Sequence, residues 1–67
     1  MENNSLCDLL RNRRIQLGYS LEYTSELVGV SMIEVEQGLL RLNSSHLCLF
    51  SKVLELDVNK LYQMNLH

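Results

Sequence analysis

The sequence predicts an all-α fold, a compact domain of five short helices. The chain has no proline, and its three glycines, Gly18, Gly29 and Gly38, are spaced about ten residues apart, where each can form the left-handed end of a helix. Small polar residues of the kind that cap helix starts lie between these glycines. Apolar residues recur at intervals of three and four, and strand-like alternation is sustained nowhere. Helices are therefore expected over residues 5–17, 21–28, 32–37, 45–55 and 58–65.

The first two helices have clear start and stop signals. The helix over 5–17 begins at Ser5, three residues before the carboxylate of Asp8. Its apolar residues follow helical spacing and are expected to be buried: Leu6, Leu9, Leu10 and Leu17. The helix over 21–28 lies between the cap candidate Ser20 and Gly29.

The other three helices also follow capping residues. Ser31 and Glu34 have the spacing of a capping box, in which each side chain accepts a hydrogen bond from the other residue's backbone N–H. Cap candidates for the last two helices are the Asn43-Ser44-Ser45 run and Asp57.

The helix over 45–55 is apolar on two sides. One face carries Leu47, Ser51 and Leu54, and the nearly opposite face carries Leu49, Val53 and Leu56. Either the last helix covers the second face with Val58, Leu61 and Tyr62, or that face is the seam of a two-fold homodimer. The candidate dimer-interface residues are Leu49, Val53, Leu56, Tyr62 and Met64.

Length and composition predict a single folded domain spanning residues 1–67. The chain has a mass of 7.8 kDa, with 46% apolar and 21% charged residues, which is enough to build one small core. A core of this size gives marginal stability, so a partner chain would help to stabilise it. No apolar run approaches the roughly 20 residues of a membrane span, and Met1–Asn4 lacks the features of a signal peptide. We therefore expect a cytoplasmic protein.

Motifs of enzymes and metal sites are missing from the sequence. Cys7 and Cys48 lie 41 positions apart with no second pair, so both are expected to be reduced. His46 and Cys48 are too few ligands for zinc, which needs three or four. No glycine-rich phosphate loop or nucleophile elbow is present. We expect no enzyme activity, no metal and no cofactor.

Four segments, in the right order, resemble one family of regulators. Leu10–Gly18 is similar to that family's first helix and closing glycine, and Ser20–Ser31 to its second helix and turn, ending in Gly-Val-Ser. Glu36-Gln37-Gly38 resembles its Glu-x-Gly, and Leu54–Tyr62 its last helix. The chain thus resembles the Cro/Xre (lambda-repressor-like) helix-turn-helix family over about residues 6–62, with the helix-turn-helix unit at about 20–38.

This resemblance implies a function and a set of contacts. It implies a small transcriptional regulator that binds double-stranded operator DNA as a homodimer, one half-site per subunit. The residues expected to face bases are Ser31, Met32, Ile33 and Glu34, and those expected to face phosphates are Ser20, Arg41 and Asn43. Glu34 could accept a hydrogen bond from cytosine or only complete the capping box. In the family an arginine of the first helix pairs with the glutamate before the late glycine, which here is Arg13 or Arg14 with Glu36.

The chain also departs from the family pattern. Between Ser31 and Glu36 it is about three residues shorter, nearly one helical turn of the segment that would read bases. Leu21 and Leu42 replace a glutamine and a loop proline of the family pattern. Residues 19–40 carry a formal charge of −4, without a lysine or arginine, whereas DNA-binding surfaces are usually basic. The expected function remains DNA binding by a homodimer, and these departures motivate an alternative, a protein-interaction module or anti-repressor that binds a related repressor.

Overall fold

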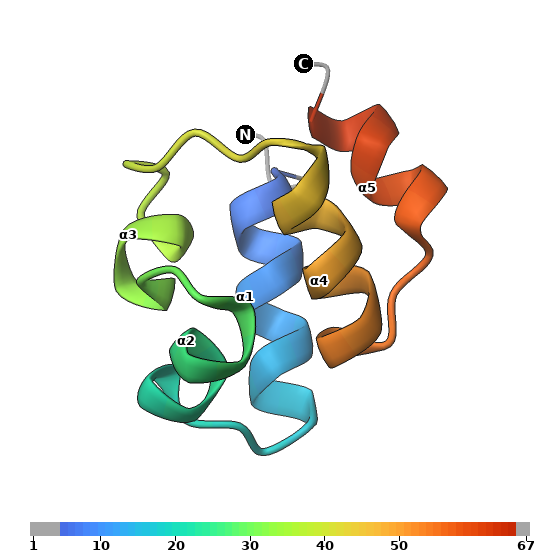
Figure 1. The fold of residues 1–67 in the computed structure, drawn as a ribbon. Helices are drawn as coiled ribbons and strands as arrows, with labels where there is room; N and C mark the ends of the chain where they lie inside the picture. Colours follow the sequence, from blue (N-terminus) through green and yellow to red (C-terminus); the bar gives the residue numbers. More distant parts are fainter. Residues whose placement is uncertain (1–4, 66–67) are drawn as a thin grey trace.

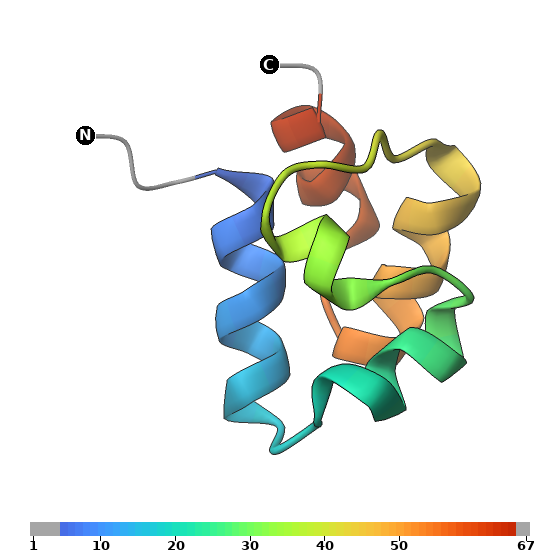
Figure 2. The ribbon, with the colours of Figure 1, turned by 90° about the vertical axis from the view of Figure 1, so that its left-hand side faces the viewer.

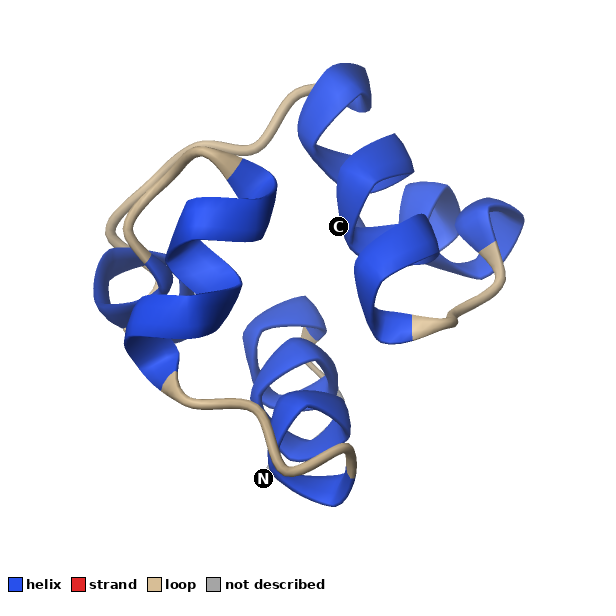
Figure 3. Ribbon diagram, turned by 60° about the horizontal axis from the view of Figure 1, so that its bottom comes forward, coloured by secondary structure: helices blue, strands red, loops and turns tan. Residues whose placement is uncertain are grey.

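The computed structural model describes residues 5–65, and this part of the chain is all-helical (Figures 1 and 3). Its elements are α1 (Leu6–Gln16), α2 (Leu21–Val28), α3 (Met32–Glu36), α4 (Ser44–Leu54) and α5 (Val58–Asn65). The predicted all-α class with five helices is confirmed for these residues, and each helix boundary lies within one residue of its prediction. None of these helices has the length and apolar character needed to span a bilayer.

Helix α1 lies between α2 and α3 on one side and α4 and α5 on the other in the view of Figure 1, and at one edge of the molecule in the turned view of Figure 2. It contacts α3, α4 and α5, while α2 packs against α3 and α4. Figure 2 shows the segment between α3 and α4 running from beside the N-terminal end of α1 to the start of α4. The described residues form a body of 27 × 25 × 21 Å.

Every helix contributes at least one side chain to a single core. The buried apolar residues are Leu10, Val28, Met32, Val35, Leu42, Leu47, Phe50, Leu54 and Leu61. Four leucines of the first predicted helix were expected to be buried, but only Leu10 is; Leu6, Leu9 and Leu17 pack half-buried at the edge of the core. This difference arises because α1 is covered on only part of its circumference, so its flanking leucines remain partly exposed.

The predicted helix starts are formed by side-chain caps. The Oγ atoms of Ser5 and Ser20 accept hydrogen bonds from Asp8 N (3.1 Å) and Tyr23 N (2.9 Å). Ser31 Oγ accepts from Glu34 N at a longer 3.4 Å, and no return bond from the Glu34 side chain is found in the described contacts. The complete capping box lies instead at the start of α4, between Asn43 and His46.

The helix ends use left-handed backbone. Gly18, Gly29 and Gly38 have φ of 77°, 78° and 75°, as their spacing predicted. Glu55 has the same conformation at the end of α4, with φ 58° and ψ 50°, although it has a side chain. A residue other than glycine pays a steric cost in this region of backbone space.

Helix α5 covers most of the second apolar face of α4. Leu61 of α5 is buried, and Val53, Leu56 and Tyr62 pack half-buried against the core. Of the candidate dimer residues on this face, Leu49 remains 38% exposed. The helix-covering explanation therefore accounts for most of this face, and Leu49 marks the part left open.

Candidate functional site

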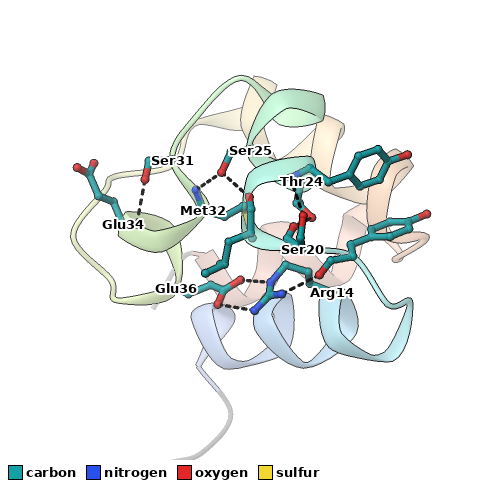
Figure 4. A network of polar contacts seen from close by, with 11 residues as sticks. Arg14, Ser20, Thr24, Ser25, Ser31, Met32, Glu34 and Glu36 are labelled. Carbon is teal, nitrogen blue, oxygen red and sulfur yellow. Dashed lines mark hydrogen bonds and ion pairs between the residues drawn. The ribbon is translucent and has the colours of Figure 1, made fainter.

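The connection between α2 and α3 is fixed by one glycine and one serine. Gly29 ends α2 in the left-handed conformation, and its N–H donates to Ser25 O (2.8 Å). Ser25 Oγ donates to Leu21 O (2.7 Å) and accepts from Met32 N (2.8 Å), so it joins the two helices directly (Figure 4). The α2–α3 unit (residues 20–36) is therefore held together by hydrogen bonds to backbone atoms as well as by core contacts.

A buried ion pair holds α3 against α1. Arg14 Nε and Nη2 donate to the two carboxylate oxygens of Glu36, at 2.6 and 3.2 Å, and Arg14 Nη1 donates to Tyr19 O (Figure 4). The side chains of Arg14 and Glu36 are only 12% and 8% exposed. Arg13, the other predicted candidate, instead donates to Leu54 O at 2.9 Å. Arg14 is thus the partner of Glu36, and the Glu36 charge is neutralised inside the molecule.

The outer surface of α2 and α3 is acidic. Glu22, Glu26 and Glu34 are exposed, and Figure 4 shows the Glu34 side chain pointing away from the neighbouring helices. The arginines of α1 are already paired, Arg11 with Asp8 and Arg13 with Glu55. The remaining cations of residues 5–65 lie outside the α2–α3 unit: Arg41, Lys52 and Lys60. The three exposed carboxylates therefore have no neutralising partner within ion-pair distance in the described part of the chain.

A shallow hollow of ≈ 320 Å³ lies on this acidic surface, between α2 and the start of α3. Its lining residues are Leu21, Glu22, Ser25, Glu26, Ser31 and Ile33. Ile33 is 51% exposed beside the two glutamates of α2. The surface thus combines an exposed apolar side chain with negative charge.

The structure separates the residues predicted to face DNA into three groups. Ser20, Ser31, Ile33 and Glu34 are exposed on the α2–α3 unit. Arg41 lines a different, open hollow of ≈ 790 Å³, formed by the start of α1, the segment after α3 and the end of α5. Asn43 is exposed at the start of α4, where its Oδ1 accepts from His46 N.

Met32 corrects the predicted base-reading set. Its side chain is completely buried, and its N–H is bonded to Ser25. Met32 precedes Val35 by three residues within α3, so both side chains lie on the face of that helix that meets the core, where Val28 of α2 is also buried. A side chain in this position cannot reach a base edge.

Two polar residues that organise the site were missed from the sequence. Ser25 lies inside α2, where a serine carries no start or stop signal, and its bond to Met32 depends on how the helices meet. His46 completes the capping box of Asn43, and the spacing of three residues between them could have suggested it.

On the opposite side of the molecule, the exposed Cys48 contacts Tyr62, with 3.3 Å between Sγ and the phenol oxygen. This hydrogen bond, together with partial desolvation, raises the pKa of Tyr62 above the ordinary 10.0. Within residues 5–65, no three His, Cys, Asp or Glu side chains are grouped to hold a metal ion.

Comparisons of the chain with protein-family models, with curated proteins and with solved structures gave no match. The arguments below therefore depend on the geometry and charge of this chain itself.

Proposed function

We propose that the chain is a helix-turn-helix domain that works as a protein-interaction module, with weak or no affinity for DNA. The helix-turn-helix assignment is supported by the order of the family-like segments and by the Gly29 turn between α2 and α3. The observation that carries the function is the acidic surface of this unit, with Glu22, Glu26 and Glu34 exposed and Glu36 buried.

The charge of this surface and the short length of α3 are both unfavourable for binding DNA. Phosphate contacts from lysine and arginine supply most of the non-specific affinity of a protein for DNA. The charged groups exposed on the α2–α3 unit are all carboxylates. Helix α3 has five residues, and its first side chain, Met32, is in the core. A short acidic element leaves few groups to read base edges in a major groove.

The same surface fits a basic protein partner. A related repressor has a basic DNA-facing surface, because that surface must contact phosphates. The three glutamates would attract it, and Ile33 with the hollow beside it would supply apolar contact. The partner class that follows is a basic protein surface, as in an anti-repressor.

Two titrations test this proposal. In the first, the protein is titrated into a labelled random DNA duplex of about 30 base pairs at about 50 and 200 mM salt, and fluorescence anisotropy measures the binding. We expect no binding below about 100 μM protein at either salt concentration. Binding at low salt that collapses at 200 mM would contradict the proposal, because it would show phosphate contacts.

In the second, a lysine- and leucine-rich helical peptide stands in for the basic partner, and amide NMR shifts locate it. We expect shifts on the α2–α3 unit, weakened by E26Q but not by E55Q, which removes an exposed carboxylate elsewhere. Shifts that lie on another surface, or that respond equally to both variants, would overturn the assignment.

DNA binding by a homodimer is the second candidate. It is favoured by the Arg14–Glu36 pair, which has the form that the Cro/Xre resemblance implies, and by the exposed caps Ser20 and Ser31 at two helix starts.

Its specific test is R41A, matched by K52A, which removes an exposed cation from α4. If this candidate holds, R41A alone weakens binding to all duplexes and lowers the salt slope by about 1. An unchanged slope in R41A would remove Arg41 from the phosphate contacts.

A further inference from the structure

We propose that His46 is a pH-sensitive latch that closes the cap at the start of α4 around Asn43. The backbone N–H of Asn43 donates to His46 Nδ1 (3.2 Å), and the backbone N–H of His46 donates to Asn43 Oδ1 (3.0 Å). Both ends of this reciprocal pair are needed for the capping box. The inference stands on this geometry and is independent of the proposed function.

The latch depends on the protonation of one ring nitrogen. Nδ1 of His46 accepts a hydrogen bond only in the neutral imidazole whose proton is on Nε2. Protonation turns Nδ1 into a donor, so the Asn43 N–H loses its acceptor. It also puts a positive charge in the first turn of an 11-residue helix, where the helix dipole favours negative charge. Both effects oppose the closed latch at low pH.

The surroundings of His46 do not offset this charge. Helices α1, α2 and α5 pack against α4. The titratable or charged groups on these four helices are, for α1, Cys7, Asp8, Arg11, Arg13 and Arg14; for α2, Glu22, Tyr23 and Glu26; for α4, Cys48 and Lys52; and for α5, Lys60 and Tyr62. The connections at the two ends of α4 add Arg41, Glu55 and Asp57. The ion pairs of the described residues join Asp8 to Arg11, Arg13 to Glu55 and Arg14 to Glu36, and no carboxylate among these groups lies within 4.0 Å of the imidazole. An imidazolium at this position would therefore lack an ion-pair partner.

The segment that leads into the latch has attachments of its own, because the Leu39 N–H donates to Glu34 O (2.9 Å) and Leu40 packs half-buried against the core. Leu42 is buried, and its carbonyl accepts a long 3.4 Å bond from Asn65 Nδ2. Leu39 is 71% exposed, and Arg41 is exposed on the open hollow. When the Asn43 N–H is released, residues 39–42 keep these contacts, and the change is confined to Asn43 and the first turn of α4. We therefore expect acid to loosen the cap at Asn43 while the core remains folded.

Amide hydrogen exchange of the full chain tests the latch. All proteins carry H67Q, so that His46 is the one imidazole, and protection factors are measured at about pH 7.5 and pH 5. We expect the protection of the Asn43 and His46 amides to fall about fivefold at the lower pH, as for the loss of one cap, while that of Leu54 is unchanged. Equal protection at the two pH values would overturn the latch.

The matched variant is H46Q, whose amide can complete the same capping box but does not titrate. The protection factor of the Asn43 amide in H46Q should be the same at both pH values. If that protection factor falls at low pH as much in H46Q as in the parent, the effect belongs to another group.

Nitrogen NMR of the imidazole at the higher pH gives an independent readout. It should show a proton on Nε2, and a proton on Nδ1 would contradict the mechanism.

Discussion

Arg14 is the residue on which the arrangement of α1, α3 and the intervening turn most depends. Its guanidinium binds Glu36 through two nitrogens and the Tyr19 carbonyl through the third. Lysine cannot reproduce this, since an ammonium lacks the planar fork. The pair affects function only indirectly. Because Glu36 is buried and neutralised, the acidic groups on the surface of the α2–α3 unit are Glu22, Glu26 and Glu34.

The Arg14–Glu36 pair should contribute far more to stability than a surface pair. We expect R14A to lower the free energy of unfolding by about 3–5 kcal/mol, because it leaves a buried carboxylate uncompensated. R11A, which breaks the more exposed pair with Asp8, should cost about 0–1 kcal/mol. Urea unfolding followed by circular dichroism measures both. If R14A does not fold, the double variant R14M/E36L should restore folding, and equal costs for R14A and R11A would contradict the assignment.

Tyr62 should ionise at higher pH than an ordinary tyrosine. Its raised pKa means that the protonated phenol is favoured in the folded state, chiefly by the Cys48 hydrogen bond. This contribution is complete below pH 10.0 and is lost as the pH rises through the folded-state pKa. Ultraviolet titration in a Y19F/Y23F background should show the raised midpoint, and C48A should lower it. A midpoint that C48A leaves unchanged would rule out the hydrogen bond as the cause.

At the scale of the elements, much of the structure could be predicted because its signals are local. The caps Ser5, Ser20 and Asn43 and the glycine ends depend on residues within a few positions of each other, so the helix boundaries were predicted closely. The orientation of α3 depends instead on contacts across the molecule. For this reason the prediction that Met32 faces bases is wrong, although its spacing of three to Val35 within α3 indicates the core.

The left-handed ends of the helices give a matched pair of substitutions. Glu55 occupies at the end of α4 the conformation that Gly29 occupies at the end of α2. We expect E55G to raise the free energy of unfolding by about 1 kcal/mol, because it removes the side chain's steric cost, and G29A to lower it by a similar amount. Thermal unfolding measures both changes. Destabilisation by E55G would mean that the 3.6 Å contact between Glu55 and Arg13 outweighs the backbone strain.

For the whole molecule, the sequence could predict one small all-α core but not which face stays open. The choice between a covered face of α4 and a dimer seam depends on where α5 packs, which is a long-range question. The structure brings α5 onto α4 and leaves Leu49 exposed, with Leu39 exposed at another place. The acidic surface, by contrast, could be expected from the charges of residues 19–40 alone.

The predicted homodimer should depend on the face of α4 that carries Leu49. If that face is the seam, L49D shifts the chain to monomer in sedimentation velocity at about 100 μM, because a buried carboxylate without a partner is strongly unfavourable. L39D is the matched control, since Leu39 is an exposed leucine outside the candidate seam. Dissociation by L39D but not by L49D would place the contact at the open hollow, and a monomeric parent would exclude the homodimer at that concentration.

The position of Leu61 has a consequence for how the protein is made. This side chain is completely buried and packs in the same core as Leu10, so the interior stays open until α5 has been synthesised. At about 5–20 residues per second, a ribosome needs roughly 3–10 s to add the residues between these two positions. Helices form in about a microsecond, so α1 waits for these seconds before Leu61 can cover its core-facing side. The nascent domain is therefore vulnerable to aggregation and to proteases until α5 emerges.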